Sequence, residues 1–154
     1  MQLTDLLRLD AVKVVNNLTS KKRLFHDLGD LAEQTFGVPS ATVAEALLER
    51  ENLGPTGVGQ GIALPHARLE SITSVCGLFL RLERSLDFDA VDRQPVDLVF
   101  ALLAPASAGV EHLKALALVS RTMRDASICA KLRANSDPAT LHAILTDSTK
   151  TQAA

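Results

Sequence analysis

The sequence predicts a single layered α/β domain, and three observations lead to that prediction. Its 154 residues match the common size of one globular domain. Apolar residues make up 47% of the chain, with 5 Phe and no Trp or Tyr, so Leu, Val, Ile and Ala must build the core. Segments typical of strands and of helices lie on both sides of a glycine-rich stretch, without a repeat or linker. We therefore treat residues 1–154 as one domain.

Hydrophobic patterning predicts the order of the elements. Apolar and β-branched runs predict strands at 12–15, 62–64, 75–82 and 96–103. Apolar residues at helical spacing predict helices at 20–36, 39–51, 111–123, 128–132 and 138–145.

Capping residues locate the ends of the first two helices. Thr19 or Ser20 can accept a hydrogen bond from the open amides at the start of the first helix. Gly37 can adopt the left-handed conformation that ends it. Pro39 is suited to the start of the second helix, where its missing N–H would have no partner.

The second half of the chain is expected to hold two paired strands and a helix. The connection at 84–95 is too short for a crossover helix, so at least part of the sheet should be antiparallel. A Pro/Ser/Gly break at 104–109 precedes a helix that starts near Glu111. Its buried face is expected to hold Leu113, Leu116, Ala117 and Met123. Residues 149–154 are expected to form a frayed tail.

Charge, cysteine content and hydropathy exclude several classes of protein. Sixteen basic and eighteen acidic residues leave no basic footprint for nucleic acid. Cys76 and Cys129 lie far apart in apolar stretches, which is typical of reduced, buried thiols in a cytosolic protein. The N-terminus has no signal-peptide pattern, and the longest apolar run, 98–110, is too short to span a membrane. We therefore expect a cytoplasmic protein with no membrane insertion.

The glycine-rich stretch, Gly54–Gly61, is expected to be a loop and offers two interpretations. Gly57, Gly59 and Gly61 alternate, so their backbone amides could approach a phosphate closely. The stretch lacks the third glycine of a dinucleotide fingerprint and the lysine of a Walker A loop. A tight turn is the commoner use of such a sequence, and the residues alone leave both uses open.

His66 is the first candidate for chemistry. It follows Pro65 and is expected to end the short strand after the glycines, where a side chain can be held rigidly. A neutral imidazole is nucleophilic near pH 7 and can carry a phosphoryl group. The alternative is an exposed, hydrogen-bonded loop histidine.

His112 and Arg50 are the other candidates. His112 lies in the first turn of a helix, whose positive end favours a neutral ring that could bind phosphate or orient another imidazole. Arg50 could bind phosphate oxygens with two donors. The alternatives are a histidine facing solvent and an arginine paired with a neighbouring glutamate. His26 and His142 are interpreted as structural, and no metal site or cofactor is expected, since no two histidines have ligand spacing.

The stretch from Gly57 to His66 resembles the active-site motif of the mannitol/fructose/nitrogen class of enzyme IIA in the bacterial phosphotransferase system. The segment from Phe88 to Leu103 is similar to the nitrogen-regulatory branch, and the pattern extends from about Leu3 to Asp147. The resemblance implies a mixed sheet between two helical layers. Ala67 is a departure, because many members carry Gly there.

The resemblance also implies a function. His66 would accept a phosphoryl group, as tele-phosphohistidine, from an HPr-like phosphocarrier (NPr) that enzyme I charges. The second histidine and the arginine of the family fall on His112 and Arg50. Phosphorylation would regulate protein targets such as potassium-transport components. The alternatives are a fructose-type enzyme IIA with a separate IIB, and a binding module of this fold without phosphoryl transfer.

Overall fold

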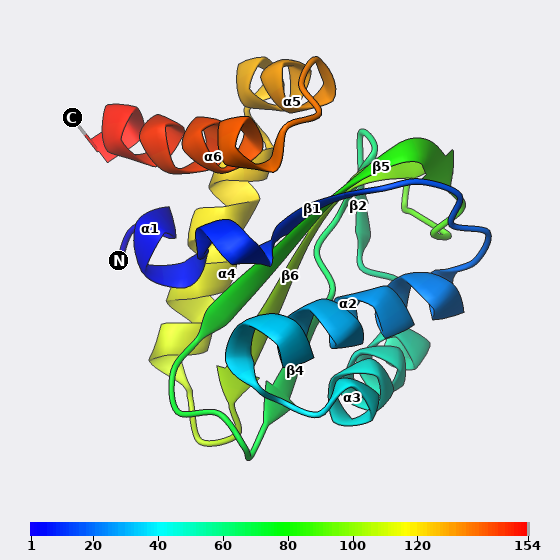
Figure 1. Ribbon diagram of the computed structural model, residues 1–154, viewed down its shortest axis with the longest axis vertical. Coiled ribbons are helices and arrows are strands. Elements are labelled where there is room, and N and C mark those ends of the chain that lie inside the picture. The colour runs from blue at the N-terminus through cyan, green and yellow to red at the C-terminus, as the bar shows by residue number, and fades with distance from the viewer. Residues whose placement is uncertain (154) are drawn as a thin grey trace.

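Within residues 1–153, whose backbone the computed structural model describes, a six-stranded mixed sheet forms the centre of the fold (Figure 1). The strands are β1 (Val12–Val15), β2 (Gly57–Gly59), β3 (Ile62–Ala63), β4 (His66–Leu69), β5 (Cys76–Leu86) and β6 (Val96–Pro105). β5 runs parallel to β1 and antiparallel to β6, and β6 runs parallel to β3 and β4. β2 pairs antiparallel with β3 at the edge. The prediction of a partly antiparallel sheet is confirmed.

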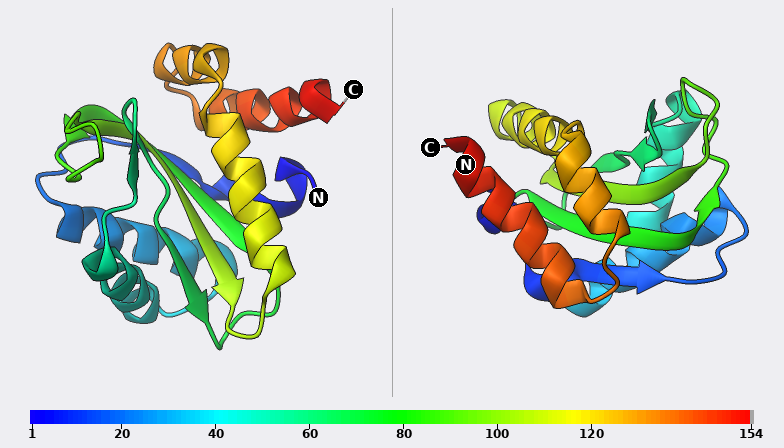
Figure 2. Two further views of the ribbon diagram at one scale, coloured as in Figure 1. Left: turned by 180° about the vertical axis from the view of Figure 1, so that it is seen from behind. Right: turned by 90° about the horizontal axis from the view of Figure 1, so that it is seen from above.

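Helices cover both faces of the sheet, which confirms the two helical layers (Figure 2). One layer holds α2 (Lys21–Phe36) and α3 (Ser40–Leu53). The other side holds α1 (Leu3–Leu6), α4 (Val110–Met123), α5 (Ala126–Arg133) and α6 (Pro138–Ala153). A short 3-10 turn, η1 (Leu9–Ala11), leads into β1.

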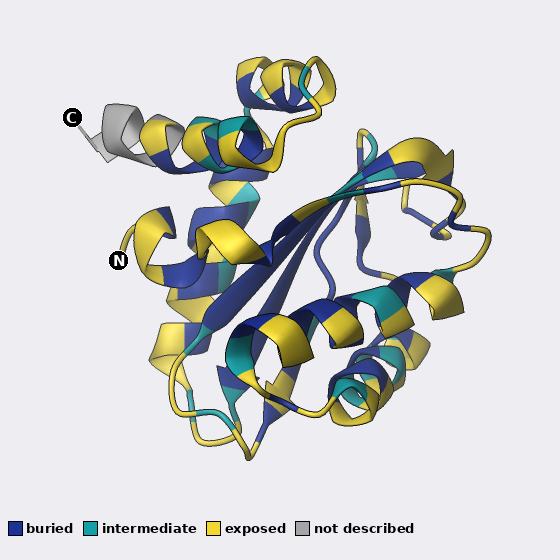
Figure 3. Cartoon of the chain, viewed as in Figure 1, coloured by how far each residue is buried: buried dark blue, intermediate teal, exposed yellow. Residues whose placement is uncertain are grey.

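The strands of the centre are buried between these layers (Figure 3). Every residue of β6 from Leu98 to Ala104 is buried, as expected for a strand covered on both faces. Phe79 of β5 and Phe100 of β6 meet edge to face, with ring centroids 6.0 Å apart. β6 is therefore rigid, and it fixes the positions of the side chains on the strands that pair with it.

The ends of α2 lie where its capping residues predict them. The Ser20 hydroxyl accepts a hydrogen bond from the Arg23 amide at 3.1 Å, and Gly37 has φ +75°. Helix α3 begins after Pro39 and extends to Leu53, two residues beyond the predicted last turn.

The predicted buried face of α4 is wrong at two of its four positions, and Met123 is buried as predicted. Leu113 is 65% exposed and Ala117 is exposed, while Leu116 is only partly buried. The residues that face inward are His112, Ala115, Leu118, Val119, Thr122 and Met123. Apolar residues surround much of this helix, so helical periodicity alone does not select the face that packs on the sheet.

Two further expectations need correction. The glycine-rich stretch is not all loop, because Gly57–Gly59 pairs with β3 in a short hairpin. His66 begins β4 rather than ending the preceding strand, because the chain resumes pairing with β6 directly after Pro65. The frayed tail expected at 149–154 stays a prediction: the backbone of α6 is helical to Ala153, and Ala154 and the side chains from residue 148 onward lie outside the described residues.

Both cysteines are buried free thiols, which confirms that interpretation. Burial raises the pKa of Cys76 to about 11 and also raises the pKa of Cys129. His142 has a structural contact, since its Nε2 lies 2.9 Å from the Leu7 carbonyl oxygen. In the described part of the chain, the structure contains no helix with the length and apolar character needed to cross a membrane.

Candidate functional site

His66 is held at the start of β4 by the neighbouring central strand. It pairs with Leu102 of β6 in parallel register. The Pro65 carbonyl oxygen accepts the Leu102 N–H at 2.9 Å. Because β6 is buried on both faces, the backbone beside His66 has little freedom to move.

A backbone hydrogen bond selects the tautomer of His66. Its Nδ1 lies 3.0 Å from the Leu64 carbonyl oxygen. A carbonyl oxygen can only accept, so Nδ1 must carry the proton and donate. Nε2 then keeps its lone pair, and the half-buried ring presents a nucleophilic nitrogen.

His112 lies directly beside His66. The two ring centroids are 5.7 Å apart and the ring planes are inclined by 69°. His112 is only 5% exposed, so the alternative of a solvent-facing residue is wrong. Both of its ring nitrogens are buried and have no hydrogen-bond partner among the described residues, so His112 has unused hydrogen-bonding capacity beside His66.

The environment keeps His112 neutral. Burial is the largest cause that lowers the pKa of His112 below the usual value near 6.5, and electrostatic interactions with His66 and Arg68 lower it further. A neutral ring carries one N–H donor and one acceptor. His112 can therefore donate to a phosphoryl oxygen without itself being a cation.

Arg50 reaches the same region from the last turns of α3. Its Nη1 donates to the Gly54 carbonyl oxygen at 3.0 Å, which leaves the other guanidinium donors for a ligand. Glu51 is not its partner, because the carboxylate of Glu51 contacts Lys21 and Thr56 instead.

An open hollow of about 590 Å³ unites these side chains between α3, β4 and α4. It is lined by Ala46, Glu49, Arg50, Leu53, His66, Ala67, Arg68, His112, Leu113 and Leu116. The three sequence candidates for catalysis thus meet in one place, with an apolar rim formed by three leucines. The surface combines cationic side chains, a type that can bind phosphate, with apolar side chains.

Sequence reasoning missed Arg68, which also lines the hollow. His66 and Arg68 stand two residues apart on β4, so both project from the same face of the strand. The burial pattern of β4 alternates accordingly, with Ala67 and Leu69 buried. The alternation of polar and apolar residues at 66–69 is the sequence signal that could have predicted this strand and placed Arg68 beside His66.

The three glycines are not brought together with His66. Gly61 contacts Asp97 at the start of β6, whereas His66 pairs with Leu102, five residues further along and roughly 16 Å away at strand spacing. The Gln60 amide donates to the Asp92 carboxylate at 2.8 Å, so the turn already binds an anionic group of the chain itself. This bond is the largest cause that lowers the pKa of Asp92.

Each glycine has a conformational reason instead. Gly59 and Gly61 have φ values of +102° and +81°, which other residues rarely adopt. A Cβ on Gly57 would lie 2.8 Å from the Cβ of Ala90, and a Cβ on Gly61 would lie 2.6 Å from Nη2 of Arg133. The geometry favours the tight-turn interpretation of this stretch.

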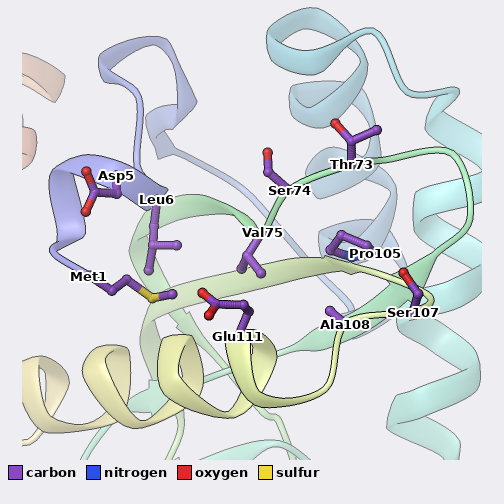
Figure 4. A pocket seen from close by; sticks show the side chains of 10 residues that line it. All are labelled: Met1, Asp5, Leu6, Thr73, Ser74, Val75, Pro105, Ser107, Ala108 and Glu111. Atoms are coloured by element: carbon purple, nitrogen blue, oxygen red, sulfur yellow. The ribbon is translucent and has the colours of Figure 1, made fainter.

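A second cavity, of about 400 Å³, lies at the start of α4 (Figure 4). Residues of α1, the β4–β5 connection and the β6–α4 loop line it, together with Glu111. None of the predicted site residues lines this cavity. Among the described residues, no group of three His, Cys, Asp or Glu side chains could hold a metal ion.

Comparisons with known proteins identify the family of the chain. The family model described as "Phosphoenolpyruvate-dependent sugar phosphotransferase system, EIIA 2" matches residues 5–148. A nitrogen regulatory protein of Bradyrhizobium diazoefficiens is 45% identical, over 94% of this chain and 95% of its own. One from Escherichia coli is 42% identical, over 96% and 91%. The crystal structure of nitrogen regulatory protein IIA-Ntr from Neisseria meningitidis superposes with a TM-score of 0.86 at 39% identity, covering 94% of this chain and 99% of that one.

Proposed function

The chain belongs to the EIIA 2 family of the phosphoenolpyruvate-dependent sugar phosphotransferase system, and from this premise we propose that it is a nitrogen-regulatory phosphoryl carrier whose acceptor is His66. An HPr-like phosphocarrier (NPr), charged by enzyme I, would be the donor. The similarity to nitrogen regulatory proteins along almost the whole chain supports this branch. The proposal places the protein in the cytoplasm, with its donor.

The tautomer of His66 is the observation that carries the proposal. With Nδ1–H donating to the Leu64 carbonyl oxygen, the Nε2 lone pair can attack the phosphorus of the donor's phosphohistidine in line. The bond from Nε2 to phosphorus forms as the donor's phosphorus–nitrogen bond breaks, and that electron pair returns to the donor's imidazole. The positive charge that develops on His66 is stabilised by the carbonyl oxygen that accepts its Nδ1–H.

The surrounding side chains supply the stabilisation that phosphoryl transfer requires. Arg50 and Arg68 bring positive charge to the hollow, and His112 brings a neutral donor. Donors already fixed in place need no reorganisation as charge shifts between the two nitrogens. Gly57, Gly59 and Gly61 have no part in this scheme, because the hairpin that contains them turns at the far end of β3.

Regulation would follow from the change in charge at the hollow. A phosphoryl group adds about −1.5 to −2 charges near neutral pH. That change would occur beside an apolar rim that a partner protein could contact, as the exposed Leu53 and Leu113 suggest. Partners such as potassium-transport components would then distinguish the two states of His66.

The experiment is labelling with phosphoenolpyruvate, enzyme I and NPr. We expect the wild type to acquire acid-labile phosphate, His66→Ala to acquire none, and His26→Ala, at an exposed position of α2, to behave as the wild type. Undiminished labelling of His66→Ala would contradict the proposal. Onward transfer to a separate IIB protein would identify the fructose-type alternative, and failure of every phosphocarrier to label the chain would identify a binding module.

A further inference from the structure

We propose that Glu51 is a positioning residue that fixes the tautomer and orientation of His66. It acts through a chain of hydrogen bonds that passes through Thr56 and Leu64. This inference rests on the proposed function of His66 as acceptor. It concerns the state of the imidazole before any phosphoryl group arrives, so it can be measured separately.

The relay begins at the buried carboxylate of Glu51. Its side chain is 5% exposed, and Lys21 of α2 places Nζ 2.9 Å from Oε2. The backbone N–H of Thr56 donates to the same carboxylate at 2.9 Å, and the Thr56 hydroxyl donates to Oε1. A buried charge persists only when it is paired and hydrogen-bonded, and here both conditions are met by groups from two other segments.

Thr56, held by Glu51, in turn fixes the position of Leu64. The Thr56 carbonyl oxygen accepts the Leu64 N–H at 3.0 Å. This bond extends the β2–β3 pairing by one step beyond Gly57 and Ala63. Because Thr56 is itself only 5% exposed and is held by Glu51, it offers Leu64 a fixed acceptor.

Leu64 in turn fixes the orientation of the His66 imidazole. Its carbonyl oxygen accepts Nδ1–H of His66 at 3.0 Å. The segment between them has a second anchor, since the Pro65 carbonyl oxygen accepts the Leu102 N–H. When Thr56 loses its bonds to Glu51, the acceptor that it offers to Leu64 can shift, and the Leu64 carbonyl can turn away from the ring.

Two consecutive residues in one turn of α3 therefore contribute to the site in different ways. Arg50 lines the hollow, while the next residue, Glu51, is buried and directs its carboxylate to Lys21 and Thr56. The link is one of position, because each hydrogen bond holds the backbone that carries the acceptor of the next one. A carboxylate three hydrogen bonds away can thus influence a group that it does not touch.

The test measures the ring nitrogens of His66 by NMR in protein with ¹⁵N-labelled histidine, together with the rate of phosphorylation by NPr. In the wild type we expect the Nδ1–H tautomer alone. In Glu51→Gln and Thr56→Val we expect a mixture of tautomers and a phosphorylation rate lower by about tenfold or more, the effect typical of losing such a supporting contact. Thr56→Ser, which keeps the hydroxyl, should restore both readouts.

Thr35→Val is the matched control, because Thr35 is a buried threonine of α2 that bonds to Asp10 away from the site. It should leave the His66 signals and the rate unchanged. Unchanged tautomers in both Glu51→Gln and Thr56→Val would overturn the proposal, and so would an equal change in Thr35→Val. A wild type that holds the Nδ1–H tautomer but accepts no phosphoryl group would instead contradict the proposed function and leave the relay intact.

Discussion

The imidazole rings of His66 and His112 meet edge to face, with centroids 5.7 Å apart, and they differ in their hydrogen bonds. His66 donates from Nδ1 to a backbone carbonyl, while both nitrogens of His112 lack a partner among the described residues. In the proposed transfer, the first ring would be the nucleophile and the second would bind the phosphoryl group that the first one receives. This asymmetry assigns different roles to two residues of the same type.

The lowered pKa of His112 predicts a loss of stability on acidification. A histidine with a folded pKa below its unfolded value near 6.5 stabilises the protein fully above pH 6.5, and that contribution is lost as pH falls toward the folded pKa. We expect the free energy of unfolding in urea to fall less between pH 7.5 and pH 5 in His112→Gln than in the wild type. The exposed His26→Gln should fall as the wild type does, and an equal fall in all three proteins would contradict the prediction.

Arg50 is predicted to accelerate transfer without being indispensable. Loss of one charge-assisted donor at a developing charge costs roughly 2–4 kcal/mol of barrier, or about 30- to 900-fold in rate. We expect Arg50→Ala to slow phosphorylation of His66 within that range, as measured by rapid-quench labelling. Arg84→Ala, which removes an arginine of β5 that does not line the hollow, is the control. A rate for Arg50→Ala equal to that of the wild type would show that the guanidinium has no role.

Arg68 is predicted to depress the pKa of its neighbour His112. Its positive charge is one of the causes that lower that pKa, so Arg68→Ala should raise it. An NMR titration of the His112 ring would record the change. Arg93→Ala, on the exposed connection before β6, should leave the titration unaltered. A His112 pKa that stays the same in Arg68→Ala would show that solvent screens the guanidinium completely.

Substitutions at Gly37 and Gly61, which have similar φ values, test whether the glycine-rich stretch is a tight turn or a phosphate-binding loop. Gly37→Ala places a Cβ in open space at φ +75°, and should cost about 1–2 kcal/mol of stability. Gly61→Ala, at φ +81°, also places a Cβ against Arg133 and Asp97, so chemical denaturation should show a larger loss. The folded Gly61→Ala protein should still be phosphorylated at a rate within about twofold of the wild type. A large fall in that rate would favour phosphate binding by the glycines.

Much of this fold could be predicted because its signals are local. The Ser20 cap, the Gly37 terminator and the buried strands β5 and β6 each depend on residues close together in the chain. The candidates His66, His112 and Arg50 lie together in one hollow, and their roles stay predictions. Their positions next to Pro65, at a helix start and at a helix end made them candidates but left the alternatives open.

What could not be predicted depends on contacts between distant segments. β4 exists because four residues after Pro65 pair with β6, and nothing within 66–69 announces that partner. The buried face of α4 is chosen by the sheet, since apolar residues lie on several sides of the helix. The role of Glu51 depends on Lys21 and Thr56, which only the folded chain places beside it.

The incorrectly predicted face of α4 leads to the last prediction, which concerns the surface around His66. Leu113 is 65% exposed and lines the hollow, whereas Val110, on the same helix and 63% exposed, does not. Replacement of either by Ser should change the free energy of unfolding by no more than about 0.5 kcal/mol, because neither is buried. If the apolar rim contacts the phosphocarrier, Leu113→Ser should raise the KM for NPr several-fold, and Val110→Ser should not. Equal KM values for the two variants would place the contact with NPr elsewhere on the protein.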